Sequence, residues 1–164
     1  MKRDPALIQL SREHHTALVL AKQAQRLGMQ SEQEQGVSSE TANFMRTLKS
    51  RFSNELEPHF CLEETYLLNE LEALSSSTHA QEIVQKAQQL AQRTRDEHDA
   101  LRQMTQRITH QDFSCLSPWG ELLATHVRFE ERELFDFIES VFSPHILSKI
   151  EAASRQLDVR NQSV

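Results

Sequence analysis

The sequence predicts an all-α fold, an antiparallel up-down four-helix bundle with an additional short C-terminal helix. Only three glycines and four prolines occur in 164 residues, so regular structure has few points at which to break. The plentiful Ala, Leu, Gln, Glu and Arg favour helix. Apolar residues recur at helical spacing through four long stretches with short connections, which is typical of antiparallel helices packed side by side.

The length and charge set limits on organisation and partners. We expect residues 1–164 to form one domain, with the bundle in residues 4–142 and the C-terminal amphipathic helix at 145–158. The net charge of −6 argues against nucleic acid or an anionic membrane as partner, because either attracts clustered Lys and Arg. No signal peptide or membrane span is apparent, and Cys61 and Cys115 are isolated thiols. We therefore expect a cytoplasmic protein. It should be a monomer or a homodimer, because the last helix can cap the bundle or contact a second copy.

The first helix is expected to begin at Asp4-Pro5. An aspartate can cap the helix, and a proline at the first position lacks only an N–H that would have no partner there. The helical pattern fades near Leu27-Gly28, and residues 30–37 predict a polar connection. The apolar stripe of this helix is Leu7, Leu10, Ala17, Leu18, Ala21 and Ala24, and His14 falls within it.

The second helix should begin at Ser38 or Ser39 and end near Leu74. Pro58 should bend or restart it, because proline lacks the N–H of a helical hydrogen bond and its ring crowds the preceding turn. The inward-facing row of this helix is Met45, Leu48, Phe52, Leu56, His59, Glu63 and Leu67.

The third helix is expected over residues 79–108, with His98 in its apolar stripe. The fourth should begin at Ser117-Pro118 and end at Ser143-Pro144. The last helix should pack across the bundle or across a second copy of the chain. The inward row of the fourth helix is Trp119, Leu122, Leu123, His126, Glu130, Leu134, Phe137 and Val141.

Two copies of one motif stand out, His59-x-x-x-Glu63-Glu64 and His126-x-x-x-Glu130-Glu131. Residues four apart lie on one face of a helix, so each histidine stacks with its glutamate. A single pair of this kind is usually a solvated surface contact. Two copies on inward-facing rows indicate groups that converge in the core.

Each long helix places one histidine in the core, and two of them add a glutamate. Ionised glutamates are almost never buried without a partner, so the sequence predicts a metal site. Imidazole and carboxylate ligands without a thiolate suit Fe, Mn or Zn rather than Cu(I) or an iron–sulfur cluster. Two glutamates from different helices can bridge two metal ions. The candidate ligands are His14, His59, Glu63, His98, His126 and Glu130.

Other groups near these positions have less specific interpretations. His14 fits the apolar stripe better than His15 does, so we favour His14 as the ligand. Cys61 lies two residues from both His59 and Glu63, so it should face away from the site. The nearest candidates for an additional ligand are Glu64, Glu97, His15 and Tyr66, each of which is more simply a solvated group or a partner of a ligand.

These motifs, taken in order, resemble the hemerythrin-like, or HHE cation-binding, family over roughly residues 4–142. The resemblance implies a four-helix bundle around two iron ions, oxo- or hydroxo-bridged, that binds O₂ or responds to oxidants, nitric oxide or iron. It makes the four histidines terminal ligands and the two glutamates bridging ligands. The motifs are Arg12-Glu13-His14-His15, His59-x-x-x-Glu63-Glu64, Glu97-His98 and His126-x-x-x-Glu130-Glu131.

The sequence departs from the family pattern on the third helix. Oxygen-carrying members have His-x-x-x-His there, whereas the positions four residues from His98 are Thr94 and Arg102. One imidazole fewer leaves an open position on the metal, where iron should oxidise or bind other ligands more readily. This argues against reversible oxygen carriage.

Several functions remain open on the sequence alone. We favour a di-iron protein that binds or senses a small ligand such as O₂ or NO over an enzyme. The alternatives are an oxidase, a peroxidase-like or an iron-oxidising enzyme, a bundle with one Zn or Mn ion, and a structural bundle whose histidines are only hydrogen-bonded.

Overall fold

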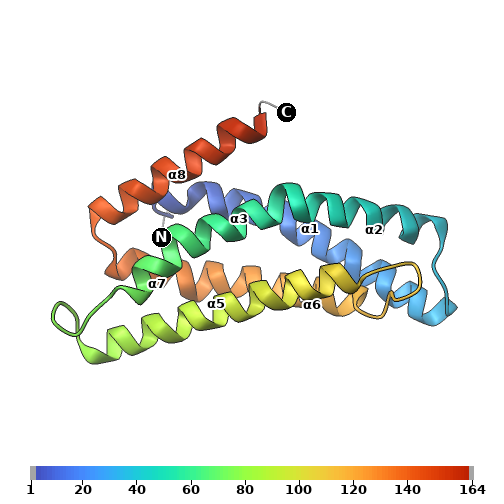
Figure 1. Ribbon diagram of the computed structural model, residues 1–164, viewed down its shortest axis with the longest axis horizontal. Coiled ribbons are helices and arrows are strands. Elements are labelled where there is room, and N and C mark those ends of the chain that lie inside the picture. Colours follow the sequence, from blue (N-terminus) through green and yellow to red (C-terminus); the bar gives the residue numbers. More distant parts are fainter. Residues whose placement is uncertain (1–2, 163–164) are drawn as a thin grey trace.

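A computed structural model describes residues 3–162, with side chains through Leu157, and every regular element in that range is a helix (Figure 1). Four long helical rods run lengthwise, and successive rods are joined at alternate ends. The first rod is α1 (Pro5–Glu34) and the third is α5 (Gln81–Arg107). The second rod is α2 (Ser39–Arg51), η1 (Phe52–Leu56), α3 (Glu57–Leu62), η2 (Glu63–Leu68) and α4 (Asn69–Glu72), where η marks a π-helical turn. The fourth rod is α6 (Leu116–Phe129), η3 (Glu130–Leu134) and α7 (Phe135–Val141), and α8 (Pro144–Gln162) follows it.

The first helix begins where the sequence predicts, but the predicted end was wrong. The Asp4 side chain accepts a hydrogen bond of 2.9 Å from the Ala6 amide. The helix continues through Gly28 to Glu34 and stops at Gln35, which has a left-handed φ of 52°. A glycine weakens a helix by only about 1 kcal/mol, and Gly28 is buried against Ser117. Its packing therefore outweighs its low helix propensity.

The remaining boundaries lie close to the predicted ones. Pro58 does restart the second rod: it stands in the first turn of α3, directly after the π-helical turn η1. The second rod ends at Glu72 rather than Leu74, and the third spans 81–107 rather than 79–108. The last helix was predicted too short, since α8 spans 144–162. Such differences at helix ends are ordinary.

The core has two apolar halves, and the predicted ligands lie between them. Along α1, Leu7 and Leu10 belong to one half, Ala17 and Leu20 to the other, and His14 stands between. The first half gathers side chains of α4, α5, α7 and α8, and the second half those of α2 and α6. The polar residues thus form one layer inside an otherwise apolar interior.

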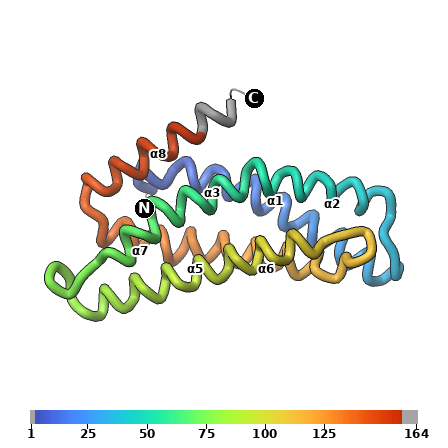
Figure 2. Tube along the Cα trace, viewed as in Figure 1, coloured from blue at the N-terminus to red at the C-terminus, as the bar shows by residue number. Residues whose placement is uncertain are grey.

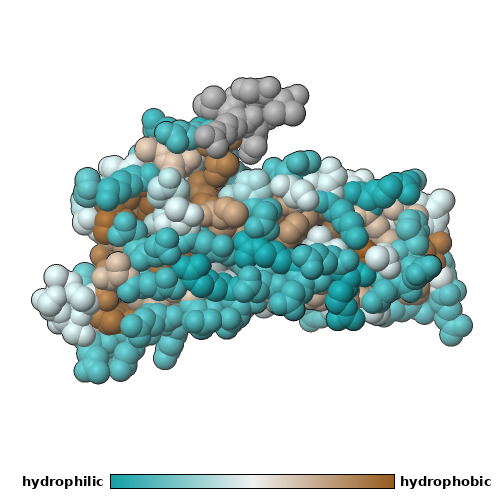
Figure 3. Space-filling view, viewed as in Figure 1, coloured by the Kyte–Doolittle hydropathy of each residue, from teal (hydrophilic) through white to brown (hydrophobic). Residues whose placement is uncertain are grey.

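The last helix packs on its own chain. It contacts α1, α3 and η2, and the chain trace places it over the N-terminal half of α1 (Figure 2). Ile150 is fully buried, while Ile146 and Leu147 pack against the first apolar half. Apolar surface is visible where α8 meets the rods (Figure 3). No helix within the described residues is long and apolar enough to cross a membrane.

The α1 and α6 helices approach each other closely at two glycines. A Cβ added to Gly120 would lie 2.4 Å from the Ala21 carbonyl oxygen, and one added to Gly28 would lie 2.4 Å from the Ser117 nitrogen. Both obstacles are backbone atoms, which move only if the helices separate. Glycine at these positions therefore sets the spacing between the helices that carry His14 and His126.

We expect Gly120→Ala to lower the free energy of unfolding by about 1–3 kcal/mol, the usual cost of overpacking a core. Gly36→Ala is the matched control, because the nearest atom to its added Cβ is the Glu34 oxygen at 3.9 Å. Urea denaturation followed by circular dichroism measures both. Equal stability of the two variants would show that the glycine contact does not limit helix spacing.

Candidate metal centre

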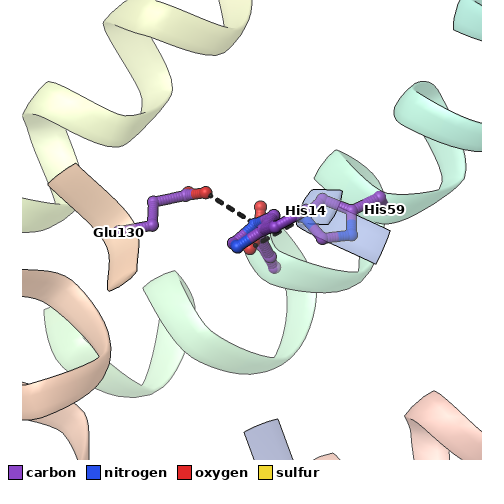
Figure 4. A group of neighbouring side chains, drawn as sticks. His14, His59 and Glu130 are labelled. Atoms are coloured by element: carbon purple, nitrogen blue, oxygen red, sulfur yellow. Dashed lines mark hydrogen bonds and ion pairs between the residues drawn. The ribbon is translucent and has the colours of Figure 1, made fainter. Parts of the chain in front are cut away.

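Six buried side chains from the four rods converge in the polar layer between the two apolar halves of the core. His14 comes from α1, His59 from α3, His98 from α5 and His126 from α6, and the two glutamates open the π-helical turns η2 and η3. None is more than 4% exposed, and Glu63 and Glu130 are fully buried. Figure 4 shows His14 between His59 and Glu130, and these three residues come from three different rods. The structure thus places all six predicted residues in one cluster.

The two inner carboxylates, Glu63 and Glu130, each lie close to two imidazoles, one on either side. Glu130 Oε2 lies 3.1 Å from His14 Nε2, and its Oε1 lies 3.1 Å from His126 Nε2. Glu63 Oε1 lies 3.2 Å from His59 Nε2, and its Oε2 lies 3.4 Å from His98 Nε2. Each carboxylate therefore directs one oxygen to either side.

These contacts define two potential cation sites that share both carboxylates. One consists of His14, His59, Glu63 and Glu130, and the other of Glu63, His98, His126 and Glu130. Within each set the four donor atoms lie within 4.8 Å of one another. Two nitrogens and two oxygens on each side are the ligand types that iron, manganese and zinc accept.

A second ring of carboxylates holds the four imidazoles in place. We call Glu13, Glu64, Glu97 and Glu131 the outer carboxylates. Each contacts the Nδ1 atom of one histidine and comes from a different rod than that histidine. The pairs are His14–Glu131 at 2.7 Å, His59–Glu13 at 2.6 Å, His98–Glu64 at 2.8 Å and His126–Glu97 at 2.8 Å.

This arrangement fixes the tautomer of the neutral imidazoles. If Nδ1–H donates to an outer carboxylate, the lone pair of a neutral ring is on Nε2, which faces the inner carboxylates. All four inner carboxylate oxygens, together with Nε2 of His98 and His126, have no hydrogen-bond partner among the described residues. The centre of the cluster is therefore a set of acceptors, and cations are what such a set binds.

Arginines hold three of the outer carboxylates from outside. Arg102 contacts Glu64 at 2.9 Å, Arg93 contacts Glu97 at 2.8 Å, and Arg3 contacts Glu131 at 3.1 Å. The positive charges of the histidine and arginine partners outweigh burial and lower the pKa of Glu64 to about 2 and of Glu131 to about 2. Ionised outer carboxylates are the stronger acceptors for imidazole N–H groups.

The residues from 6 to 138 match the family model of the hemerythrin HHE cation-binding domain. The chain belongs to the hemerythrin HHE cation-binding family. No curated protein and no solved structure matched the chain. The six converging residues all lie inside the matched segment of this HHE domain, whereas α8 lies outside it.

The structure shows where the other candidate residues of the HHE motifs lie. His15 is exposed, and the cluster contains His14 instead. Glu64 and Glu97 contact ligand candidates rather than join either group of four. Tyr66 is 41% exposed, and Cys61 is exposed as well. Cys61 is not a member of either group.

No imidazole replaces the missing fifth histidine in the described part of the chain. Thr94 is buried one turn before His98, and its hydroxyl donates to the Leu90 carbonyl at 2.9 Å. Arg102 is directed at Glu57 and Glu64. Both side chains are thus bonded to groups other than the six ligand candidates.

The sequence reasoning missed the roles of Glu13 and Glu131. The sequence does carry a signal for these roles in the repeated order of its residues. A glutamate directly precedes His14 and His98, and a glutamate directly follows Glu63 and Glu130. Neighbouring helical residues point about 100° apart, so one side chain faces inward while the next reaches a neighbouring rod. The π-helical turns at both glutamate pairs are local widenings that often occur at functional sites.

We expect Glu97→Ala to lower metal affinity about 10- to 100-fold, the usual effect of removing a carboxylate that orients a ligating histidine. Asp96→Ala is the control, because Asp96 is an exposed neighbour that contacts Gln92 instead. Competition with a chromophoric chelator measures both affinities. Equal affinities for the two variants would contradict a role for Glu97 in holding His126.

Buried carboxylates also favour protonation of the imidazoles when no cation is bound. Burial lowers the pKa of His126, but the charge of Glu130 and the contacts with Glu130 and Glu97 outweigh it and raise the pKa to about 10. The pKa of His59 is likewise raised, because Glu63 and Glu13 outweigh burial. Protons and metal ions therefore compete for the same nitrogens.

Metal binding should release protons, because the imidazoles with raised pKa are protonated below that pKa and must lose the proton to bind a cation. Apparent affinity should rise as pH increases from 6 to 8.5, by up to about tenfold per pH unit for each proton released. Calorimetry in buffers of different ionisation enthalpy gives the number of protons. Binding heats that do not depend on the buffer would contradict this competition.

Proposed function

We propose that this chain is a di-iron protein that binds O₂ or responds to oxidants, nitric oxide or iron at a centre held by six side chains. His14, His59, His98 and His126 would be the terminal ligands, and Glu63 and Glu130 would bridge the two ions. One observation carries the proposal: the two oxygens of each inner carboxylate face opposite sides. One oxygen faces His14 or His59, and the other faces His98 or His126.

The donor set supports two ions better than one. A single ion at either group of four would leave the other two imidazoles and one oxygen of each carboxylate facing an empty position. Iron suits mixed imidazole and carboxylate ligands and more than four coordination positions, while a structural zinc site is normally complete with four ligands. When bound, two iron ions would supply a redox-active pair with positions open to small ligands. Zinc or manganese is the alternative.

A cavity beside the centre supports a small ligand rather than an organic substrate. It has a volume of about 80 Å³ and is lined by His14, His59, His126 and Glu130 among others. One water needs about 10–15 Å³ of such space, so the cavity holds several waters or a diatomic molecule. An oxidase, peroxidase-like or iron-oxidising enzyme is the second candidate, favoured by the lack of a fifth imidazole at Thr94 or Arg102. Sustained turnover of O₂ or H₂O₂ with a reductant would identify it.

The architecture supports this assignment. We propose that the four rods are an antiparallel up-down bundle forming a single domain with α8, because successive rods are joined at alternate ends (Figure 1) and α8 packs on the same core. A monomer or homodimer remains our prediction. The net charge of −6 continues to argue against nucleic acid or membrane as a partner.

The test is iron content together with the visible spectrum. Protein loaded with Fe(II) without oxygen and then exposed to air should retain about two irons per chain, the number that the two groups of ligands can hold, and should develop charge-transfer absorption. His59→Ala and Glu130→Ala should lose most of that iron because each removes a donor from the centre. His145→Ala, at an exposed histidine, should retain it.

Full iron content in His59→Ala and Glu130→Ala would refute the assignment. About one metal ion per chain, which is unaffected by air, would favour the mononuclear zinc or manganese alternative.

A further inference from the structure

The cavity beside the centre has an ion pair at its outer end. Arg51 and Glu55 line it together with Thr16, which is exposed, and with His14 and His59 at the buried end. Arg51 and Glu55 are on successive turns of the rod that carries His59 one turn further on. Their side chains are 27% and 49% exposed. They therefore lie between solvent and the buried imidazoles.

We propose that the Arg51–Glu55 ion pair is a gate that limits how fast small uncharged ligands enter the cavity. The proposal rests on the metal centre of the proposed function. Arg51 Nε lies 3.0 and 3.1 Å from the two Glu55 oxygens, and its Nη2 lies 2.7 Å from Oε2. Such a two-point contact orients both side chains across the rim.

The walls behind the ion pair determine which ligands fit. They are formed by buried apolar side chains of α1, η1 and α6, including Ala17, Leu20, Leu56, Leu123 and Val127. An anion would lose its water shell on entering this section without gaining a partner. Uncharged diatomic molecules such as O₂ and NO lose little by the same transfer.

The other side of the centre is covered by packing. The Phe60 ring stacks on His98 with a centroid distance of 3.9 Å and an angle of 14°, and His98 does not line the cavity. Ligand entry through the cavity is thus directed toward His14, His59 and His126, and away from His98. On this path the ion pair is the part that moves most easily, because a partly exposed pair is held weakly whereas the walls are close-packed.

The test is the rate of nitric oxide binding to the iron-loaded protein, measured by stopped-flow absorption. Exposed ion pairs shift an equilibrium by about 1.5- to 5-fold, so Arg51→Ala and Glu55→Ala should each speed association by that factor. The double variant should match the single ones, because all three remove the same contact. Equilibrium affinity should be unchanged, since no ligand to the metal is altered.

The dependence of the association rate on salt concentration distinguishes the gate from a change in cavity shape. High salt screens exposed charges, so the wild-type rate should rise toward that of the variants, whose own rates should not respond. Arg95→Ala is the matched control: it breaks a similar arginine–glutamate pair with Glu72, 2.9 Å apart, away from the cavity. It should keep both the wild-type rate and its dependence on salt.

Xenon exchange in the zinc-loaded protein, measured by ¹²⁹Xe NMR, is a second readout that needs no iron chemistry. Exchange should be faster in Arg51→Ala than in Arg95→Ala. Equal nitric oxide and xenon rates in wild type and all variants at every salt concentration would overturn the gate. A wild-type protein that holds no iron would refute the proposed function instead, while the xenon comparison would still test the gate.

Discussion

Glu63 and Glu130 are enclosed at the middle of the molecule, and no described group donates a hydrogen bond to any of their four oxygens. Burying an ionised carboxylate without a compensating charge is among the most costly changes in a protein interior. The cost is removed when positive charge lies between the carboxylates and the imidazoles that face them, either as protons or as metal ions. Most of the other polar features of the molecule follow from this requirement.

The side chains around Glu63 and Glu130 form two equivalent positions at which such positive charge can be bound. Each half of the chain contributes the same parts: a Glu-His pair on one rod and a His-x-x-x-Glu-Glu motif on the next. Outer carboxylates connect the rods within each half through Glu13 and Glu97, and between the halves through Glu64 and Glu131. The two apolar halves of the core then hold this polar layer at fixed spacing. The arrangement is close to twofold symmetric in its ligands but not in its access, because the cavity is lined by His14, His59 and His126 whereas Phe60 stacks on His98.

Much of this could be predicted from local patterns. Helical spacing of apolar residues predicted the four rods, and the restart at Pro58 followed from the geometry of proline. The same spacing indicated that His14 rather than His15 faces inward. The end of α1 was predicted wrongly, because the close contact of Gly28 with Ser117 involves residues far apart in the sequence. The outer carboxylates were missed for a similar reason: whether Glu13 is solvated or holds His59 depends on how one rod is rotated against another, which periodicity within one helix does not determine.

Anomalous X-ray diffraction at the iron edge, from crystals of the iron-loaded protein, tests the shared carboxylates most directly. The account predicts two peaks about 3.5–4 Å apart, the usual spacing of two bridged metal ions, one beside His14 and His59 and the other beside His98 and His126, with Glu63 and Glu130 between them. A single peak, or two peaks that do not share these carboxylates, would contradict it.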